Sequence, residues 1–340
     1  MKRTLLAASF LLLLAYGAGT RQTATHMFDE IAPGVFFATG GDKVTTGSNA
    51  MVVVNEDDVL LVDSHISPEA ARALIASVKT LTNKPIRTVV NSHYHYDHAN
   101  GNQVFGKDVQ IIGHEFTRMK LLGDVLHEAT YLNNGSPASL ARNATSLEAQ
   151  IGKAAAAEKP ALEARLATLK RHIIELAEVK PTPPNVTVTN KLTLYRGSRE
   201  IRILHLGRGH TAGDLVVFLP AERIVFTGDL FFASAPYLGD GYPEEFIETL
   251  EKLKAVKFDV CVPGHGPLVR DRAQIGFNQR YLREYWAQVK GFHAAKLSAK
   301  EAKAKLDLSK YEAFARFQLT TPGVLDIEVG RLYSLLGGGN

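Results

Sequence analysis

The sequence has 340 residues, of which 45% are hydrophobic and 22% charged, the balance of an ordinary globular protein. It has no periodic repeat or low-complexity tract, which excludes a solenoid and a disordered chain. Its 39 basic and 35 acidic residues give a net charge of only +4, so composition gives no reason to expect a nucleic acid or an anionic membrane as partner.

Residues 1–19 have the pattern of a secretory signal peptide. Lys2 and Arg3 precede an apolar run over residues 5–18, and small residues near its end suit a cleavage site. The run is too short to span a bilayer comfortably, so a cleaved signal is favoured over a membrane anchor. Loss of Lys2 and Arg3 lowers the net charge to +2. We therefore expect an exported protein, periplasmic or secreted, without a stable membrane anchor.

After a linker at residues 20–26, the chain is expected to form strands and a helix. Apolar and β-branched runs separated by turn residues predict strands at residues 35–38, 50–54, 59–62 and 86–90. A helix is predicted over residues 68–81, because Leu74, Ile75 and Val78 fall on one of its faces.

Residues 115–183 are predicted to be a helical insertion. The stretch 147–179 is rich in Ala, Leu, Glu and Lys with helical periodicity, which is interrupted at Pro160. A proline-rich segment, residues 181–184, ends it. The pattern indicates a helical hairpin or a lid.

The second half of the chain repeats the alternation of strands and helices. Strands are expected at residues 186–194, 200–206, 215–219, 223–227 and 260–263. A helix is expected at 244–254, and the chain is helical again from residue 273, with a capping box formed by Ser298 and Glu301. Two such halves predict an α/β fold in which two sheets pack together with helices outside.

Potential metal ligands are concentrated directly after the strand at residues 86–90. They are His93, His95, Asp97 and His98. Side chains alternate in an extended loop, so His93, His95 and Asp97 are expected on one side, with His98 facing elsewhere. Imidazole and carboxylate are the ligands that zinc uses when no thiolate is present. His93 and His95 would bind one ion, and Asp97 and His98 a second.

Three later residues complete a candidate metal site. His210 lies between two expected strands, and Asp229 and His265 each follow one directly. Glycines flank all three, which allows close approach of the backbone. Each residue alone is as consistent with a structural role as with metal binding, whereas together with the first cluster they indicate a site for two metals.

This pattern resembles the metallo-β-lactamase superfamily over residues 27–270, the expected catalytic domain. Five marker regions occur in the family's order: Asp63, the cluster at residues 93–98, His210, Asp229 and His265. The resemblance implies a four-layer αββα sandwich with two divalent metal ions, expected to be zinc, at one edge. The C-terminal extension, residues 271–340, would pack on the same domain.

The resemblance also implies roles for individual residues. The first metal would be bound by His93, His95 and His210, and the second by Asp97, His98 and His265. Asp229 would bridge the two ions. Asp63 would orient a ligand imidazole, or serve only as a turn residue at the end of a strand.

Asp229 and the residues that follow it argue against several known branches of the family. Asp229 stands where one group of β-lactamases has a cysteine, and Phe232 replaces both the lysine of those enzymes and the tyrosine typical of lactonases. Glyoxalase II shares the aspartate, but its Gly-Cys-Gly-Arg stretch is missing here. Residues 209–220 look like those of exported lactamase-like hydrolases, and no named subfamily fits every position.

The expected activity is hydrolysis of an ester, lactone, thioester or amide bond, including a β-lactam, by a hydroxide shared between the two metals. Asp97 would orient this nucleophile and shuttle its proton. Aromatic residues near the ligands are interpreted either as a pocket for an apolar small-molecule substrate or as core packing. These residues are Tyr94, Tyr96, Phe231, Phe232 and Tyr237.

Two other functions remain open at this point. A persulfide dioxygenase of the same family would use a single iron, and a non-catalytic exported protein would bind metal or a partner through the insertion. The complete set of seven ligands favours the hydrolase. Four further residues with reactive side chains are interpreted as structural: His65, His114, His205 and Cys261.

Overall fold

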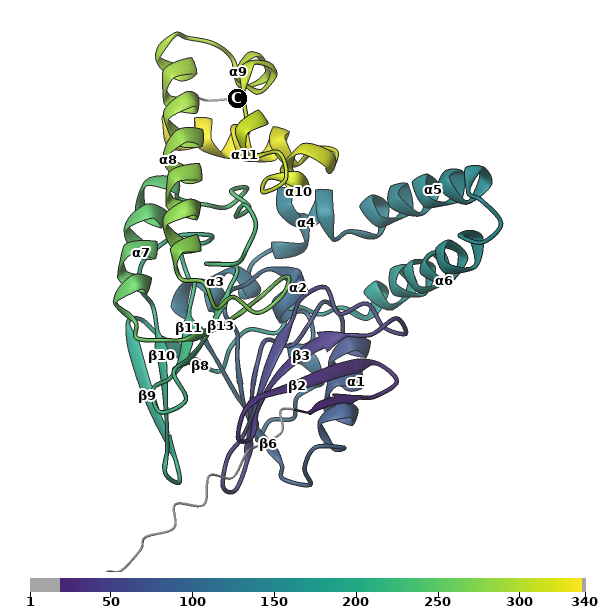
Figure 1. Cartoon of the computed structure of the whole chain (residues 1–340), viewed down its shortest axis with the longest axis vertical. Helices are drawn as coiled ribbons and strands as arrows, with labels where there is room; N and C mark the ends of the chain where they lie inside the picture. Colours follow the sequence, from purple (N-terminus) through teal and green to yellow (C-terminus); the bar gives the residue numbers. More distant parts are fainter. Residues whose placement is uncertain (1–18, 338–340) are drawn as a thin grey trace, which may run out of the picture.

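The computed structural model describes residues 19–337 of the chain. The predicted signal segment, except for Gly19, lies outside the described residues. Two β-sheets pack face to face in the centre of the molecule, with helices on both outer faces (Figure 1).

The first sheet has eight strands that follow one another in chain order. Its strands are β1 (Thr20–Gln22), β2 (His26–Ala32), β3 (Val35–Gly40), β4 (Ala50–Val54), β5 (Val59–Val62), β6 (Ile86–Val90), β7 (Gln110–His114) and β8 (Val186–Val188). Neighbours from β1 to β5 are antiparallel, and those from β5 to β8 are parallel.

The second sheet has five strands in the order β13-β12-β11-β10-β9. Its strands are β9 (Lys191–Arg196), β10 (Arg199–Leu204), β11 (Val216–Leu219), β12 (Ile224–Gly228) and β13 (Val260–Pro263). All neighbours are antiparallel except β12 and β13, which are parallel.

The alternation of side chains along a strand divides the core into layers. In β3, Val35 and Phe37 point to the second sheet and pack with residues of β10–β13. Phe36 and Ala38 lie on the opposite, outer face of the first sheet. This outer face is covered by α1 (Pro68–Val78) through Leu74. The first two layers of the sandwich are thus a helix and a sheet.

The outer face of the second sheet is covered by α7 (Pro243–Ala255) and α8 (Ala273–Ala294). Fully buried residues such as Phe246 and Tyr281 join these helices to Val225 of β12 in one apolar cluster. The order of layers is therefore helix, sheet, sheet, helix, and the predicted αββα sandwich is confirmed.

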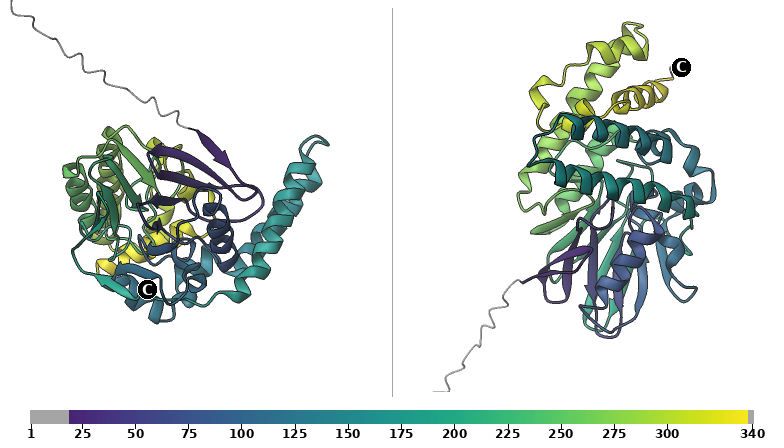
Figure 2. Two further views of the ribbon diagram at one scale, coloured as in Figure 1. Left: turned by 90° about the horizontal axis from the view of Figure 1, so that it is seen from below. Right: turned by 90° about the vertical axis from the view of Figure 1, so that its right-hand side faces the viewer.

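The insertion is helical, as predicted, and its two longest helices lie side by side and extend away from the sheets (Figures 1 and 2). The helices between β6 and β8 are α2 (Tyr96–Ala99), α3 (Glu115–Leu122), α4 (Ala129–Asn134), α5 (Pro137–Lys153) and α6 (Lys159–Glu175). The predicted interruption of the helical stretch occurs, but it lies just before Pro160 and not at it. The chain turns at residues 154–158, and Pro160 lies in the first turn of α6, where a missing N–H costs nothing.

The C-terminal part continues from α8 into α9 (Ala299–Lys305), α10 (Arg316–Thr320) and α11 (Val324–Leu335). Ser298 and Glu301 form the predicted capping box at the start of α9. Helices α10 and α11 lie above α4 of the insertion (Figure 1). Among residues 19–337, no helix is both long and apolar enough to cross a membrane.

Other differences from the sequence prediction have local causes. The expected linker at residues 20–26 contains β1 and the start of β2, which belong to the partly exposed edge of the sheet and lack an apolar run. The short strand β7 was also missed. The expected strand 186–194 is two strands, because the chain passes from the first sheet to the second at Thr189 and Asn190.

Candidate metal centre

The predicted ligands lie where strands of both sheets end. Asp63 follows β5 and the segment His93–His98 follows the parallel neighbour β6. Asp229 and His265 follow β12 and β13, which are also parallel. His210 lies in the connection between β10 and β11. Carboxyl ends of parallel strands meet at one edge of a sheet, so residues distant in sequence converge there.

Donor atoms of all seven predicted ligands form one continuous cluster. Three groups have donor atoms within 4.8 Å of one another: His93, His95 and His210; His93, His98 and Asp229; Asp97, His98 and His265. The groups share His93 and His98, which links them. Most of these side chains are buried, and His265 is the most exposed, with 35% of its side chain accessible. Solvent therefore reaches the cluster from the side of His265.

The expectation that Asp97 faces the same way as His93 and His95 is wrong. The extended backbone ends at His95, which is the N-cap of α2, and Asp97 lies in the first turn of that helix. The helical turn directs its carboxylate to His265, with Asp97 Oδ2 and His265 Nε2 3.1 Å apart. Strand alternation therefore holds for the two histidines alone.

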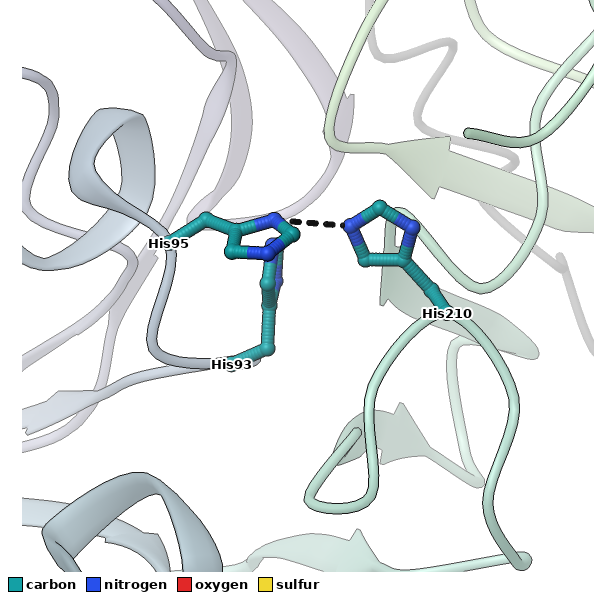
Figure 3. Close-up of side chains that lie close together, drawn as sticks. All are labelled: His93, His95 and His210. Atoms are coloured by element: carbon teal, nitrogen blue, oxygen red, sulfur yellow. Dashed lines mark hydrogen bonds between the residues drawn. The ribbon is translucent and has the colours of Figure 1, made fainter. Parts of the chain in front are cut away.

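The first donor set has three imidazoles whose inner nitrogens converge from loops of both sheets (Figure 3). The outer Nε2 of His95 donates to Asp240 Oδ2 at 3.0 Å, and the outer Nδ1 of His210 donates to the carbonyl oxygen of Tyr237 at 3.0 Å. Both acceptors lack a proton to offer, which assigns the outer nitrogens as donors. In the neutral imidazoles, the inner nitrogens, His95 Nδ1 and His210 Nε2, are then bare lone pairs, 2.9 Å apart.

His93 supplies a third bare nitrogen to this set. Ser92 Oγ donates to Asp63 Oδ2 at 2.8 Å, so it accepts from His93 Nδ1 at 3.0 Å. The remaining nitrogen, His93 Nε2, is buried without a hydrogen-bond partner. Lone pairs that converge without a donor need a cation among them, and the donor set therefore fits a metal ion.

The second donor set combines imidazoles with carboxylates. His265 Nε2 lies 3.1 Å from Asp97 Oδ2 and 3.2 Å from Asp229 Oδ2, and His98 Nε2 lies 3.4 Å from Asp229 Oδ1. Asp229 Oδ2 is also 3.7 Å from His210 Nε2 in the first set. The carboxylate of Asp229 thus reaches both sets, and its Oδ1 is buried without a hydrogen-bond partner.

The pKa values indicate that histidines of the two donor sets differ in charge. Burial and neighbouring imidazoles lower the pKa of His210 to about 4 and that of His93 well below its usual range, which keeps both rings neutral. Burial also disfavours a charged His98, but Asp97 and Asp229 outweigh it and raise the pKa of His98 well above its usual range. The carboxylates thus hold positive charge at the second set, which a divalent cation would supply.

Asp63 lies behind the second set rather than within it. Its buried carboxylate accepts from His98 Nδ1 at 2.7 Å and from the backbone N–H of Ser92 at 2.7 Å. The backbone of Asp63 is left-handed, with φ at 65°, and the side chain points to the segment at residues 92–98. Its contact leaves His98 Nε2 to face the carboxylates, which is the orienting position expected from the sequence.

Some of the aromatic candidates pack away from the metal ligands, and others contact the ligand rings. Phe231 is buried in the cluster beneath the second sheet, so it packs in the core. Tyr94 packs with helix α3 and lines a small cavity shared with Tyr96. Phe232 meets the ring of His265 edge-on, with centroids 6.1 Å apart, and Tyr237 lies 6.2 Å from His210. Phe232 therefore lies beside the most exposed of the ligands, although its own side chain is largely buried.

The residues interpreted as structural lie outside the three donor groups. His65 is buried against His26, and His114 caps α3 by accepting from the N–H of Phe116. His205 Nδ1 bonds the carbonyl oxygen of Asp214. The thiol of Cys261 is buried, and burial raises its pKa to about 12.

Sequence reasoning missed the outer partners of the first donor set. Asp240 and the carbonyl of Tyr237 lie in the connection between β12 and α7, and Thr130 of α4 donates to the same Asp240 carboxylate. Burial opposes ionisation of Asp240, but His95 and Thr130 keep its pKa below the usual range. No local pattern marks Asp240, because its partners lie more than 100 residues away.

Comparison with known proteins identifies the family of the chain. The family model described as the metallo-beta-lactamase superfamily matches residues 44–265, more than half of the chain. The chain therefore belongs to the metallo-beta-lactamase superfamily, and the predicted family is confirmed.

Curated relatives share parts of the chain at low identity. A linear primary-alkylsulfatase from Pseudomonas sp. is 23% identical over 68% of this chain and 44% of its own length. Metallo-beta-lactamase type 2 from Bacteroides fragilis is 25% identical over 64% of this chain and 69% of its own length. A 55-residue stretch is 42% identical to a hydroxyacylglutathione hydrolase from Brucella ovis, which is 16% of this chain and 21% of that protein. The chain thus spans less than half of the alkylsulfatase. These names are those of hydrolases, which supports the prediction of a metal-dependent hydrolase.

Solved structures show the same fold. A metallo beta lactamase from Erythrobacter litoralis has a TM-score of 0.52 at 18% identity and covers 78% of this chain and 100% of that chain. The DIM-1 metallo-beta-lactamase has a TM-score of 0.51 at 17% identity and covers 77% of this chain and 99% of that chain. At such identities the likeness concerns the fold alone.

Proposed function

We propose that the protein is a hydrolase that holds two divalent metal ions and cleaves an ester, lactone, thioester or amide bond of a small molecule. The observation that carries the proposal is the convergence of His95 Nδ1 and His210 Nε2, 2.9 Å apart, in two rings whose outer nitrogens already donate, beside the unpartnered Nε2 of His93. Two lone pairs at this distance repel each other unless a cation lies between them. Membership of the superfamily supports the same conclusion.

Each donor set is assigned one ion, and zinc is the proposed metal because imidazole and carboxylate donors suit it. The first set is His93, His95 and His210, and the second is Asp97, His98 and His265. Asp229 is assigned to both, since its carboxylate lies within 3.7 Å of nitrogens in each set.

Two bound divalent ions would supply a Lewis acid for the scissile carbonyl and would lower the pKa of a bound water towards roughly 7. The chain's own contribution is the placement of acids and bases around that space. Burial opposes ionisation of Asp97, yet His98 and His265 lower its pKa well below the usual range, so it is a carboxylate at neutral pH. We assign Asp97 Oδ2 the orientation of the attacking water and the uptake of its proton.

The substrate is proposed to approach from the side of His265, the most exposed of the ligands. Phe232 lies against this ring and would contact an apolar group of the substrate. The relatives' names add sulfate esters, β-lactams and hydroxyacyl thioesters to the bonds that merit testing.

The second donor set separates this proposal from the alternatives. A persulfide dioxygenase with one iron would not require Asp97, His98 and His265 as a further set. A non-catalytic member of the superfamily would be expected to lack one of the ligands, whereas all seven belong to the three donor groups. We also propose that the protein is exported and acts in the periplasm or outside the cell after removal of residues 1–19.

The proposal is tested by a substrate panel on the zinc-loaded protein. The panel contains an aryl ester, a lactone, a thioester, a β-lactam and an alkyl sulfate, and Asp97→Ala is assayed beside the wild type. We expect turnover of at least one substrate and a loss of about 100-fold or more in kcat for Asp97→Ala. No turnover on any substrate, or equal rates in the variant, would contradict the proposal.

A further inference from the structure

The segment Leu230–Tyr242, between β12 and α7, supplies outer partners to two of the three imidazoles of the first donor set. The carbonyl oxygen of Tyr237 accepts from His210 Nδ1, and the carboxylate of Asp240 accepts from His95 Nε2, each at 3.0 Å. We call this segment the partner loop. A shift in the loop would rotate both imidazoles, because these hydrogen bonds set the directions of their inner nitrogens.

The partner loop has no helix or strand of its own. Its backbone is held instead by the C-terminal helices. The N–H of Ala235 donates to the carbonyl oxygen of Phe314 at 2.9 Å. Gln318 Nε2 of α10 donates to the carbonyl oxygens of Ala235 and Pro236 at 3.2 and 3.3 Å. These contacts hold the backbone directly before Tyr237.

Glu328 of α11 holds the same loop on the other side of Tyr237. Its Oε1 accepts from the backbone N–H of Leu238 at 3.0 Å, and its Oε2 accepts from the hydroxyl of Tyr285 at 3.0 Å. The side chain is fully buried, where an unpaired carboxyl group is costly and an apolar side chain would pack without that cost. The carboxyl group at this position is explained by the backbone N–H that it binds.

We infer that Glu328 and Gln318 are positioning residues of the first donor set, which act through the partner loop on His95 and His210. The C-terminal helices then set the geometry of one half of the metal centre although they contribute no ligand. This inference rests on the metal centre of the proposed function, and it assigns a role to the extension that follows the family's matched residues 44–265.

The second donor set provides an internal comparison. Its histidine His98 is oriented by Asp63, which follows β5 in the first sheet. Phe232 of the loop meets the ring of His265, but it precedes the part of the loop that Gln318 and Glu328 hold. Release of the loop around Tyr237 should therefore weaken the first metal site and leave the second unchanged. A general loss of stability would weaken both sites together, so the difference between them separates positioning from folding.

The experiment is a titration of the metal-free full chain with Co²⁺, followed by the visible absorption of the ion and by competition with a chelator. Glu328→Met removes the acceptor at similar size, whereas Glu328→Gln keeps an oxygen that can accept from the N–H of Leu238. Asp326→Asn is the control on the same helix, because Asp326 pairs with Lys303 at the surface and does not touch the loop. Circular dichroism checks that each variant is folded.

We expect the wild type, Glu328→Gln and Asp326→Asn to bind two Co²⁺ ions with similar affinities. In Glu328→Met, one binding event should weaken by about 10- to 100-fold and the other should stay within about twofold, as for other losses of outer partners. If Glu328→Met does not fold, Gln318→Met decides, with an expected weakening of one event by about 5-fold or more.

Equal affinities at both sites in a folded Glu328→Met, or equal weakening of both, would overturn the inference while the proposed function stands. If Gln318→Met decides, two unchanged binding events would overturn it in the same way. A wild type that binds no Co²⁺ would overturn both the inference and the proposed function.

Discussion

Asp240 accepts a hydrogen bond from Nε2 of His95 at 3.0 Å, although 145 residues separate the two in the sequence. The bond fixes which nitrogen of His95 faces the candidate metal centre. Thr130 donates to the same carboxylate. Asp240 of the partner loop therefore contacts both the insertion, through Thr130, and the ligand segment at residues 93–98, through His95. Loss of a residue that orients a metal ligand typically lowers metal affinity by about 10- to 100-fold.

Asp240→Ala is expected to weaken metal binding at the first donor set by about 10- to 100-fold, because His95 loses the acceptor that fixes its orientation. Asp240→Asn keeps an oxygen acceptor and should lose less. Competition with a chelator measures both affinities. Equal affinity in Asp240→Ala and the wild type would show that His95 is oriented by other contacts.

Gly264→Ala is expected to abolish binding of at least one metal ion. A Cβ at this position would lie 2.2 Å from Asp229 Oδ1 and 2.8 Å from His98 Cε1, so the bridging carboxylate or the ring must move. Metal content after dialysis measures the effect. The matched control is Gly266→Asn, since the space around a Cβ there is open and Asn tolerates its positive φ. Two ions retained in Gly264→Ala would contradict the assignment of Asp229 to both sets.

Phe232→Ala is expected to raise KM by about 10-fold with little change in kcat, because the ring lies beside the exposed ligand His265 and would contact the substrate rather than the reacting atoms. Steady-state kinetics on the best substrate of the panel measures both constants. Phe231→Leu, in the buried core beneath the sheet, serves as the comparison and should alter stability without this change in KM. A fall in kcat alone for Phe232→Ala would exclude the substrate-contact role.

The buried Glu328 predicts a pH dependence of stability. Burial raises its pKa from 4.5 to about 7, so the folded state binds the proton more tightly than the unfolded state. The stability from this proton is fully present below pH 4.5 and is lost as the pH rises through about 7, a change of roughly 3 kcal/mol for the full shift. Glu328→Gln removes the titration and should gain stability relative to the wild type over this range.

Urea unfolding at pH 5, 6, 7 and 8 measures this difference in the free energy of unfolding. Glu163→Gln, an exposed substitution in the insertion, is the control and should show no such trend. A difference between Glu328→Gln and the wild type that stays constant with pH would mean that Glu328 is ionised throughout.

The sequence predicts the sandwich and its ligands because their signals are local. Runs such as Val59–Val62 are apolar and rich in strand-forming residues, and the ligands at residues 93–98 follow a strand within one short segment. The same reasoning fails for Asp97, since a four-residue helix leaves no periodicity long enough to detect. It also misplaces the break near Pro160 by a few residues, because a proline that begins a helix and one that breaks it look alike in sequence.

The support of the ligands could not be predicted from the sequence. Asp240 and Glu328 carry no motif, and their functions depend on contacts with His95 and with Leu238 that only tertiary packing creates. A buried acid in an amphipathic helix has the same sequence signature as an exposed one until its neighbours are known. The C-terminal extension therefore reads as additional helix in sequence, whereas the structure places it against the loop that orients the first donor set.

The presence of two metal sites is tested by the metal content of the purified wild type, His210→Ala and His265→Ala, measured by mass spectrometry. We expect two divalent ions per wild-type chain and one in each variant, because each substitution removes a ligand of a different donor set. One iron per wild-type chain with oxygen consumption, or a content that neither substitution changes, would contradict it.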